Sequence, residues 1–276
     1  MAKTVALALG GGGARGLAHI AMLEVFDELG VKPVALAGAS MGAIYAASYA
    51  SGLSASDLHD YTIATLADRR GTRSKLLAAR TGRWADIFSS LGNPVMIDGE
   101  AFCEAFLPQA VPQTFAQCTI PLTVVATDYY ARCERVFTKG LLRPAIAASM
   151  AIPGAIRPVR IDGRVLVDGA TVNPLPIDHL AGKADIIVGV DVSGAPTVAG
   201  EADMPGAWEA MFGALQIMQG AIVDAKAAQY RPDILIRPNV GSIRALDFGR
   251  SSVIFRLAKP AKEELKRRLG ALIEGE

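Results

Sequence analysis

The sequence predicts an α/β protein: a three-layer α/β/α sandwich with a mostly parallel central sheet. Short apolar runs alternate with segments of helical periodicity, which is typical of strands separated by covering helices. Residues 185–190 form a continuous apolar run, as expected for a strand buried on both faces. At 276 residues and 51% hydrophobic composition, the chain is too apolar to be disordered. We expect one domain over residues 1–276, with motifs in 5–192 and residues 200–276 packed on the same domain.

The individual elements follow from local patterns. Residues 4–9 are an apolar run closed by glycines, which predicts the first strand, and 17–29 have the spacing of an amphipathic helix. A strand at 34–37 leads into a helix to about residue 50, and a capping box at 54–57 starts a third helix. The remaining expected elements are strands at 122–127 and 134–138, a hairpin at 159–167, a strand at 185–190, a helix within 207–229, a strand near 233–236 and a helix at 261–272.

Charge and cysteine content narrow the class of protein. The net charge is +1, from 28 basic and 27 acidic residues, so we expect no nucleic-acid partner. The three cysteines form no C-x-x-C pair, which predicts a reducing, cytoplasmic compartment without a disulfide framework or zinc site. Residues 34–56 carry no charge but consist largely of small residues, so we expect a buried strand, turn and helix there. Residues 68–83 are locally basic, which indicates a solvated face or, as the alternative, a contact for anionic lipid headgroups.

A glycine-rich loop follows the first expected strand. Gly11, Gly12 and Gly13 precede Arg15 at the start of a helix, where backbone N–H groups can bind an anion. The loop also fits G-x-G-x-x-G, so a dinucleotide-binding oxidoreductase is one alternative. That interpretation needs a carboxylate at the end of the second strand, and the sequence has none there.

A second motif lies after the second expected strand. Residues 38–42 fit G-x-S-x-G between a short strand and an apolar helix, which is the context of a nucleophile elbow. Such a turn exposes the Ser40 hydroxyl, and the helix start at Met41 offers N–H groups to a developing oxyanion. A glycine-rich turn without chemistry is the weaker interpretation.

A serine nucleophile needs a proton acceptor. His19 and His59 lie where structural or surface roles are expected, and His179 is the second candidate base. Asp168 ends the expected hairpin before a turn of small residues, where partial burial would raise its pKa and strengthen it as a base. From spacing alone, a turn aspartate is an equally good interpretation.

With its motifs in this order, the chain resembles the patatin-like phospholipases over residues 5 to about 192. The glycine loop, the serine turn and Asp168-Gly169-Ala170 match in sequence, as do the segments 148–154 and 173–176. The resemblance implies a three-layer fold in which Ser40 attacks an ester carbonyl and Asp168 takes its proton. It further implies that Gly11, Gly12 and Gly13 hold the oxyanion and that Arg15 braces their loop. It implies no cofactor, and the sequence has no metal-binding cluster, so we expect metal-independent chemistry.

By the same resemblance, the partner is a lipid or acyl-ester substrate, with peripheral membrane contact as a further expectation; the oligomeric state stays open. Met41, Ile44, Ile152 and Ile156 could line an acyl slot, although we expect at least half of them to be ordinary core residues. Two alternatives remain. The chain could be a non-catalytic lipid-binding or regulatory protein, or it could transfer the acyl group to an alcohol.

Overall fold

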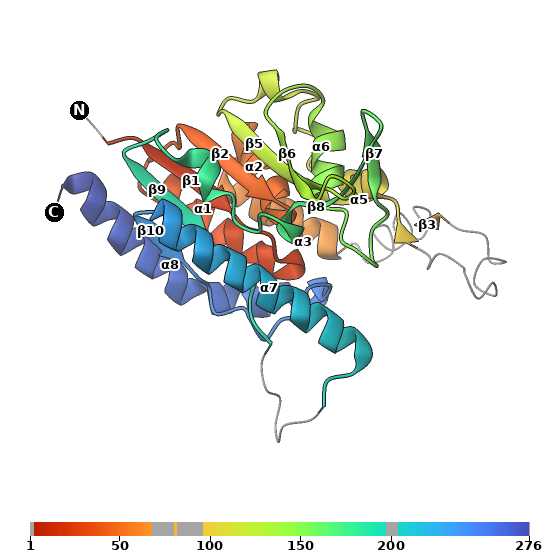
Figure 1. Cartoon of the computed structure of the whole chain (residues 1–276). Coiled ribbons are helices and arrows are strands. Elements are labelled where there is room, and N and C mark those ends of the chain that lie inside the picture. Colours follow the sequence, from red (N-terminus) through yellow and green to blue (C-terminus); the bar gives the residue numbers. More distant parts are fainter. Residues whose placement is uncertain (1–2, 68–79, 82–95, 197–203, 276) are drawn as a thin grey trace.

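The computed structural model describes residues 3–67, 80–81, 96–196 and 204–275 (Figure 1). Over these residues, a mixed eight-stranded sheet has the strand order β10-β9-β1-β2-β5-β8-β7, and β6 also pairs with β5. Strands β10, β9, β1, β2 and β5 run parallel, whereas β6 and β8 are antiparallel to β5. The strands are β1 (Val5–Leu9), β2 (Ala35–Ala39), β5 (Leu122–Asp128), β6 (Cys133–Phe137), β7 (Val159–Ile161), β8 (Arg164–Asp168), β9 (Ile186–Val190) and β10 (Ile234–Ile236).

Helices and short 3-10 turns connect these strands, and β3 (Arg80–Thr81) pairs with β4 (Met96–Ile97) apart from the main sheet. The α-helices are α1 (Ala18–Glu28), α2 (Met41–Ala50), α3 (Ala55–Ala67), α5 (Gly99–Phe106), α6 (Leu142–Ser149), α7 (Ala207–Tyr230) and α8 (Ser251–Glu274). The 3-10 turns are η1 (Gly13–Leu17), η3 (Phe115–Gln117), η4 (Gly169–Thr171), η5 (Ile177–Leu180) and η6 (Phe248–Arg250).

Alternating side-chain size in β1 and β2 separates the two faces of the sheet. Leu7, Leu9 and Leu36 point into the larger core, which α1, α2 and α8 complete. On the opposite face, Ile177 of η5 and Val223 of α7 pack with four alanines of the two strands, Ala6, Ala8, Ala35 and Ala37. Helical layers on both faces of a mostly parallel sheet make the predicted three-layer α/β class correct.

The expected elements are present with shifted boundaries. A 3-10 turn from Gly13 precedes α1, and α5 and α6 were not expected. Helix α8 begins ten residues earlier than the expected 261 and continues through Pro260, because Ile254, Ala258 and Leu265 keep its buried stripe continuous. The basic segment 68–83 lies outside the described residues except for β3. Among the helices described, none combines the length and apolarity needed to cross a membrane.

The arrangement around β5 positions the candidate site. Strand β2 runs parallel along the first half of β5, with Ala39 opposite Val125. Strand β8 runs antiparallel along the second half, with Asp168 opposite Ala126. Because β2 and β8 approach each other along β5 from opposite directions, the residue after β2 and the last residue of β8 meet.

Candidate active site

Ser40 occupies a strained turn between β2 and α2. Its backbone has φ 53° and ψ −128°, a combination that non-glycine residues rarely adopt and that is typical of functional turns. The Ser40 N–H donates to Ser149 Oγ at 2.8 Å, and that hydroxyl donates to the Val125 carbonyl at 2.6 Å. The turn is therefore tied to α6 and β5.

The glycines on either side make the turn sterically feasible. A Cβ on Gly42 would lie 2.1 Å from the Leu9 carbonyl oxygen, and a Cβ on Gly38 would lie 2.6 Å from the Gly42 carbonyl oxygen. Contacts this short exclude any side chain. The spacing of G-x-S-x-G thus reflects close packing of the turn against β1.

Asp168 contacts Ser40 directly. Asp168 Oδ2 accepts the hydrogen bond of Ser40 Oγ at 2.7 Å, and Oδ1 accepts the N–H of Ala170 at 2.8 Å. The Asp168 backbone is held as well, since its N–H donates to the Ala151 carbonyl and its carbonyl accepts from Thr127 Oγ1. The carboxylate is consequently fixed in an orientation that leaves one oxygen for the serine.

Burial makes this carboxylate a stronger base than an ordinary aspartate. Desolvation raises the pKa of Asp168 to about 6, although the hydrogen bonds from Ser40 and the Ala170 N–H oppose the shift. A carboxyl group with this pKa is largely ionised at neutral pH and accepts a proton more readily than one near 4. The Ser40 hydroxyl is thus bonded to a buried carboxylate whose pKa is raised.

The glycine loop lies beside Ser40, but one of its amides is already engaged. A Cβ on Gly11 would lie 3.1 Å from the Ser40 Cβ. The Gly11 N–H, however, which was expected to hold an oxyanion, donates to the Pro174 carbonyl at 2.9 Å and is therefore already engaged by a protein acceptor. In the described part of the chain, the amides of Gly12 and Gly13 donate to no protein acceptor.

Arg15 is buried behind this loop, with only 2% of its surface exposed. Its Nε donates to the Val192 carbonyl at 3.0 Å and its Nη1 to the Ile243 carbonyl at 3.2 Å. With the Gln216 amide oriented to face the guanidinium, its oxygen accepts from Nη2 at 3.0 Å. Burial lowers the pKa of Arg15 to about 10, against the attraction of Asp191, so the group stays charged at neutral pH. Arg15 thus joins the glycine loop to three distant segments.

Two of the histidines are engaged away from Ser40. His19 is fully buried, and its Nε2 donates to the Gly10 carbonyl at 2.8 Å. Burial lowers the pKa of His19 to about 4, so the ring is neutral at physiological pH. His59 faces Asp60 on the surface of α3.

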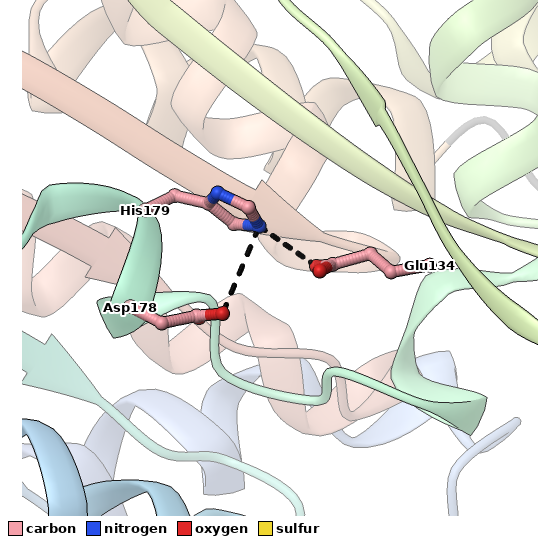
Figure 2. Close-up of side chains that lie close together, drawn as sticks. All are labelled: Glu134, Asp178 and His179. Carbon is pink, nitrogen blue, oxygen red and sulfur yellow. Dashed lines mark hydrogen bonds and ion pairs between the residues drawn. The ribbon is translucent and has the colours of Figure 1, made fainter.

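His179 belongs to a separate polar cluster with Glu134 and Asp178 (Figure 2). Its Nε2 lies 2.9 Å from Glu134 Oε1 and 3.8 Å from Asp178 Oδ2. Hydrogen bonding to Glu134 raises the pKa of His179, against the effect of burial. Because Ser40 is bonded to Asp168 and His179 to Glu134, the geometry favours Asp168 over His179 as the base.

This cluster also has ligand types that could hold a metal ion, since the three groups lie within 4.8 Å of one another. Its carboxylates are already engaged, however: Lys226 from α7 bonds to Asp178, and the Asn173 amide donates to both Glu134 and Asp178. We interpret the cluster as an anchor for the segment that carries Pro174.

The remaining expected residues are divided between a cavity and the core. Met41 and Ile44 line an apolar cavity between α2, α3 and α5, together with Leu17, Tyr45, Tyr61, Thr62, Thr65, Leu66 and Phe106. Ile152 and Ile156 are not among its lining residues; Ile156 is buried in the core, and Ile152 is half-buried against it.

Sequence reasoning assigned no role to Ser149 or to the Pro174 carbonyl. Both residues lie in segments that match the family, 148–154 and 173–176, but the match gave neither of them a role, and the acceptor role of a backbone carbonyl cannot be read from a sequence.

Comparison with known proteins identifies the family. The family described as patatin-like phospholipase matches residues 7–181. The chain therefore belongs to the patatin-like phospholipase family.

Relatives agree with this assignment, and a solved structure shares the fold. An uncharacterized NTE family protein of Mycobacterium tuberculosis is 38% identical over 197 residues, which cover 69% of this chain and 49% of that protein. Patatin-like phospholipase domain-containing protein 6 of Homo sapiens is 31% identical over 202 residues, covering 69% of this chain and 13% of that protein. The crystal structure of VipD from Legionella pneumophila shares the fold, with a TM-score of 0.50, 14% identity and coverage of 96% of this chain and 67% of that chain. The chain thus spans about half the length of the mycobacterial relative and a much smaller part of the human one.

Proposed function

We propose that this protein is a serine lipid-acyl hydrolase in which Ser40 is the nucleophile and Asp168 the general base. One observation carries the proposal: Ser40 Oγ, in the turn between β2 and α2, donates a hydrogen bond of 2.7 Å to the buried carboxylate of Asp168 at the end of β8. The pair supplies the alcohol and the proton acceptor that acyl transfer requires, and family membership indicates a lipid ester as the substrate.

In the proposed acylation step, Ser40 Oγ attacks the ester carbonyl carbon while its proton passes to Asp168. The negative charge that develops on the carbonyl oxygen is held by the N–H groups of Gly12 and Gly13 and by the amide of Met41 at the start of α2. The carbon–oxygen bond to the leaving alcohol then breaks, and Asp168 returns the proton to that alcohol.

Deacylation repeats the chemistry with water. Asp168 takes a proton from a water molecule that attacks the acyl-Ser40 carbonyl, and the proton then passes to Ser40 Oγ as the fatty acid leaves. The free enzyme is restored with the dyad in its starting protonation state. Each step uses groups of this chain, so we propose that hydrolysis needs neither metal nor cofactor.

The proposal is tested by labelling and chelation together. A fluorophosphonate probe is expected to form a covalent adduct at Ser40, located by mass spectrometry of the digested protein. Hydrolysis of a panel of acyl esters is expected to proceed equally in EDTA, because no step uses a cation. A label on another residue, or loss of activity in EDTA with recovery on added Ca²⁺, would contradict the mechanism.

Replacing Gly12 by alanine tests the proposed oxyanion site. The new Cβ would lie 2.4 Å from the Val192 carbonyl oxygen, so the loop must shift and its N–H groups lose their alignment. We expect kcat/KM to fall by about 10²-fold or more, as when an oxyanion donor is lost.

Gly220→Ala is the matched control for this variant. Gly220 lies in α7 with open space around it, so alanine there is expected to keep the activity and to stabilise the helix by up to about 1 kcal/mol. Esterase assays and thermal unfolding of both variants decide the matter, and a folded Gly12→Ala enzyme with wild-type kcat/KM would remove Gly12 from the mechanism.

A further inference from the structure

The side of α7 that faces away from the protein is apolar, although it lies on the surface. Ile217, Met218 and Met211 have 62%, 53% and 40% of their surface exposed. They share this outer face with small exposed residues at helical spacing, namely Ala210, Ala214 and Ala221. Glu209 is the only charged residue from 204 to 223, and Asp224, exposed and paired with Arg237, ends the apolar stretch. A helix whose solvent side carries so little charge normally packs against something.

The opposite side of α7 lies against the candidate active site. Gln216 faces Arg15 behind the glycine loop, Val223 packs with Ile177, and Lys226 bonds to Asp178. The helix also contacts η4, the turn that follows Asp168, and Figure 1 shows it lying along the outside of the molecule. The apolar outer face is thus one helix thickness from the segments that form the site.

A basic loop adjoins the helix at Arg15. The Ile243 carbonyl accepts from Arg15 and the Ala245 carbonyl accepts the Ala14 N–H, so this loop and α7 meet at the same side chain. Leu246, 52% exposed, lies in this loop, and two exposed arginines flank it in the sequence: Arg244 in the loop and Arg250 at the end of η6. Neither arginine has an acidic partner within salt-bridge distance among the described residues, and the nearby Asp247 is half-buried.

We propose that the outer face of α7 and Leu246 dock on the surface of an anionic phospholipid bilayer. Ile217, Met218, Met211 and Leu246 enter the boundary between headgroups and acyl chains, and Arg244 and Arg250 are attracted to the net negative charge of the anionic headgroups. This inference rests on the proposed function, because a docking surface close to the active site is useful to an enzyme whose ester substrate lies in the membrane.

The chemistry of the face favours a bilayer over a second copy of this chain. Specific protein interfaces use aromatic anchors and about one hydrogen bond per 100–200 Å². The outer face has flexible methionines, one isoleucine and alanines, with little polarity to fix a partner's orientation. Such a surface suits a fluid apolar phase, and the exposed Arg244 and Arg250 supply charge complementarity to anionic headgroups.

Flotation with vesicles tests the proposal. Wild-type protein is expected to bind vesicles of phosphatidylcholine mixed with phosphatidylglycerol, and to bind phosphatidylcholine vesicles more weakly. The double variant Ile217→Glu/Met218→Glu is expected to lose at least about tenfold in binding, because it removes two buried apolar side chains from the interface. Its kcat/KM for a dispersed short-chain ester is expected to stay within about twofold of wild type, since the change is remote from Ser40.

Val34→Glu is the matched control, because Val34 is an exposed apolar residue, 38% accessible, at the amino end of β2 and away from Ser40. It is expected to bind vesicles as wild type does. Arg244→Ala/Arg250→Ala is expected to weaken binding to the anionic vesicles and to leave binding to phosphatidylcholine unchanged.

The outcomes separate the proposal from its rivals. No binding of wild-type protein to anionic vesicles, or equal binding by the Ile217→Glu/Met218→Glu variant, would overturn the proposal. A wild-type dimer that the double variant converts to monomer, with vesicle binding unchanged, would assign the face to a second copy. Ser40→Ala is expected to bind vesicles normally. Vesicle binding without any ester hydrolysis by wild-type protein would therefore refute the proposed function and leave the docking surface standing.

Discussion

Replacement of Ser40 by alanine is expected to lower kcat/KM for acyl esters by at least about 10⁴-fold in a protein that remains folded, as for other serine nucleophiles. The hydroxyl that attacks the carbonyl is lost, and no other hydroxyl is bonded to the Asp168 carboxylate in the described structure. The variant also leaves the buried carboxylate without one hydrogen-bond donor. We expect a loss of about 1–2 kcal/mol in the free energy of unfolding at pH 8.

Ser48→Ala gives a matched control in α2, the helix that follows Ser40. Ser48 is fully buried in α2, and its hydroxyl has no hydrogen-bond partner among the described residues. Its removal is expected to leave kcat/KM unchanged and to be neutral or stabilising by about 1 kcal/mol. Esterase kinetics and urea unfolding of the two variants provide the comparison, and substantial hydrolysis by folded Ser40→Ala would exclude Ser40 as the nucleophile.

Asp168→Asn is expected to reduce kcat/KM by about 10³-fold while making the protein more stable at pH 8. The amide cannot accept the serine proton, so general-base catalysis is lost. Its oxygen can still accept the Ala170 N–H, and its nitrogen can donate to Ser40 Oγ, so the packing is preserved. The gain in stability comes from removing a charge that is 5% exposed.

The pH dependence of that gain follows from the raised pKa. The pKa of Asp168 is about 6 in the folded protein, above its ordinary value of 3.8, so folding favours the protonated form. The contribution of protonated Asp168 to the free energy of unfolding is fully present below about pH 3.8 and is lost as the pH rises through 6. Above pH 6, ionised Asp168 therefore lowers the free energy of unfolding of the wild type by on the order of 2–3 kcal/mol, and the Asp168→Asn variant does not have this loss.

Urea unfolding of both proteins at pH 4 and pH 8 measures this difference, and we expect it to shrink strongly at pH 4. The wild-type activity should fall below about pH 6 as the base is protonated. If Asp168→Asn kept near-normal rates, the base would have to be another group, with His179 the first to examine.

Local features of the chain could be predicted because they depend on neighbouring residues. Runs of alternating leucine and alanine specify β1 and β2, and the spacing of Gly38 and Gly42 around Ser40 specifies the elbow, since each acts within a few residues. The family resemblance named Asp168 as the partner, whereas spacing alone left it equally well explained as a turn residue. The start of α8 was predicted wrongly: the expected helix began after Pro260, because proline inside a helix is unfavourable, whereas α8 includes this residue.

Only the tertiary structure decided how the site is assembled. Ser40 and Asp168 are separated by 128 positions, and they meet because β2 and β8 share one edge of β5 from opposite directions. The Gly11 amide is occupied because Pro174 returns to it from the far side of the sheet, and His179 is held by Glu134. The sequence by itself determined the tight turn around Ser40 and the class of fold, because both depend on local spacing. The base, the free amides and the bare outer face of α7 depend on contacts between distant segments, which no local pattern encodes.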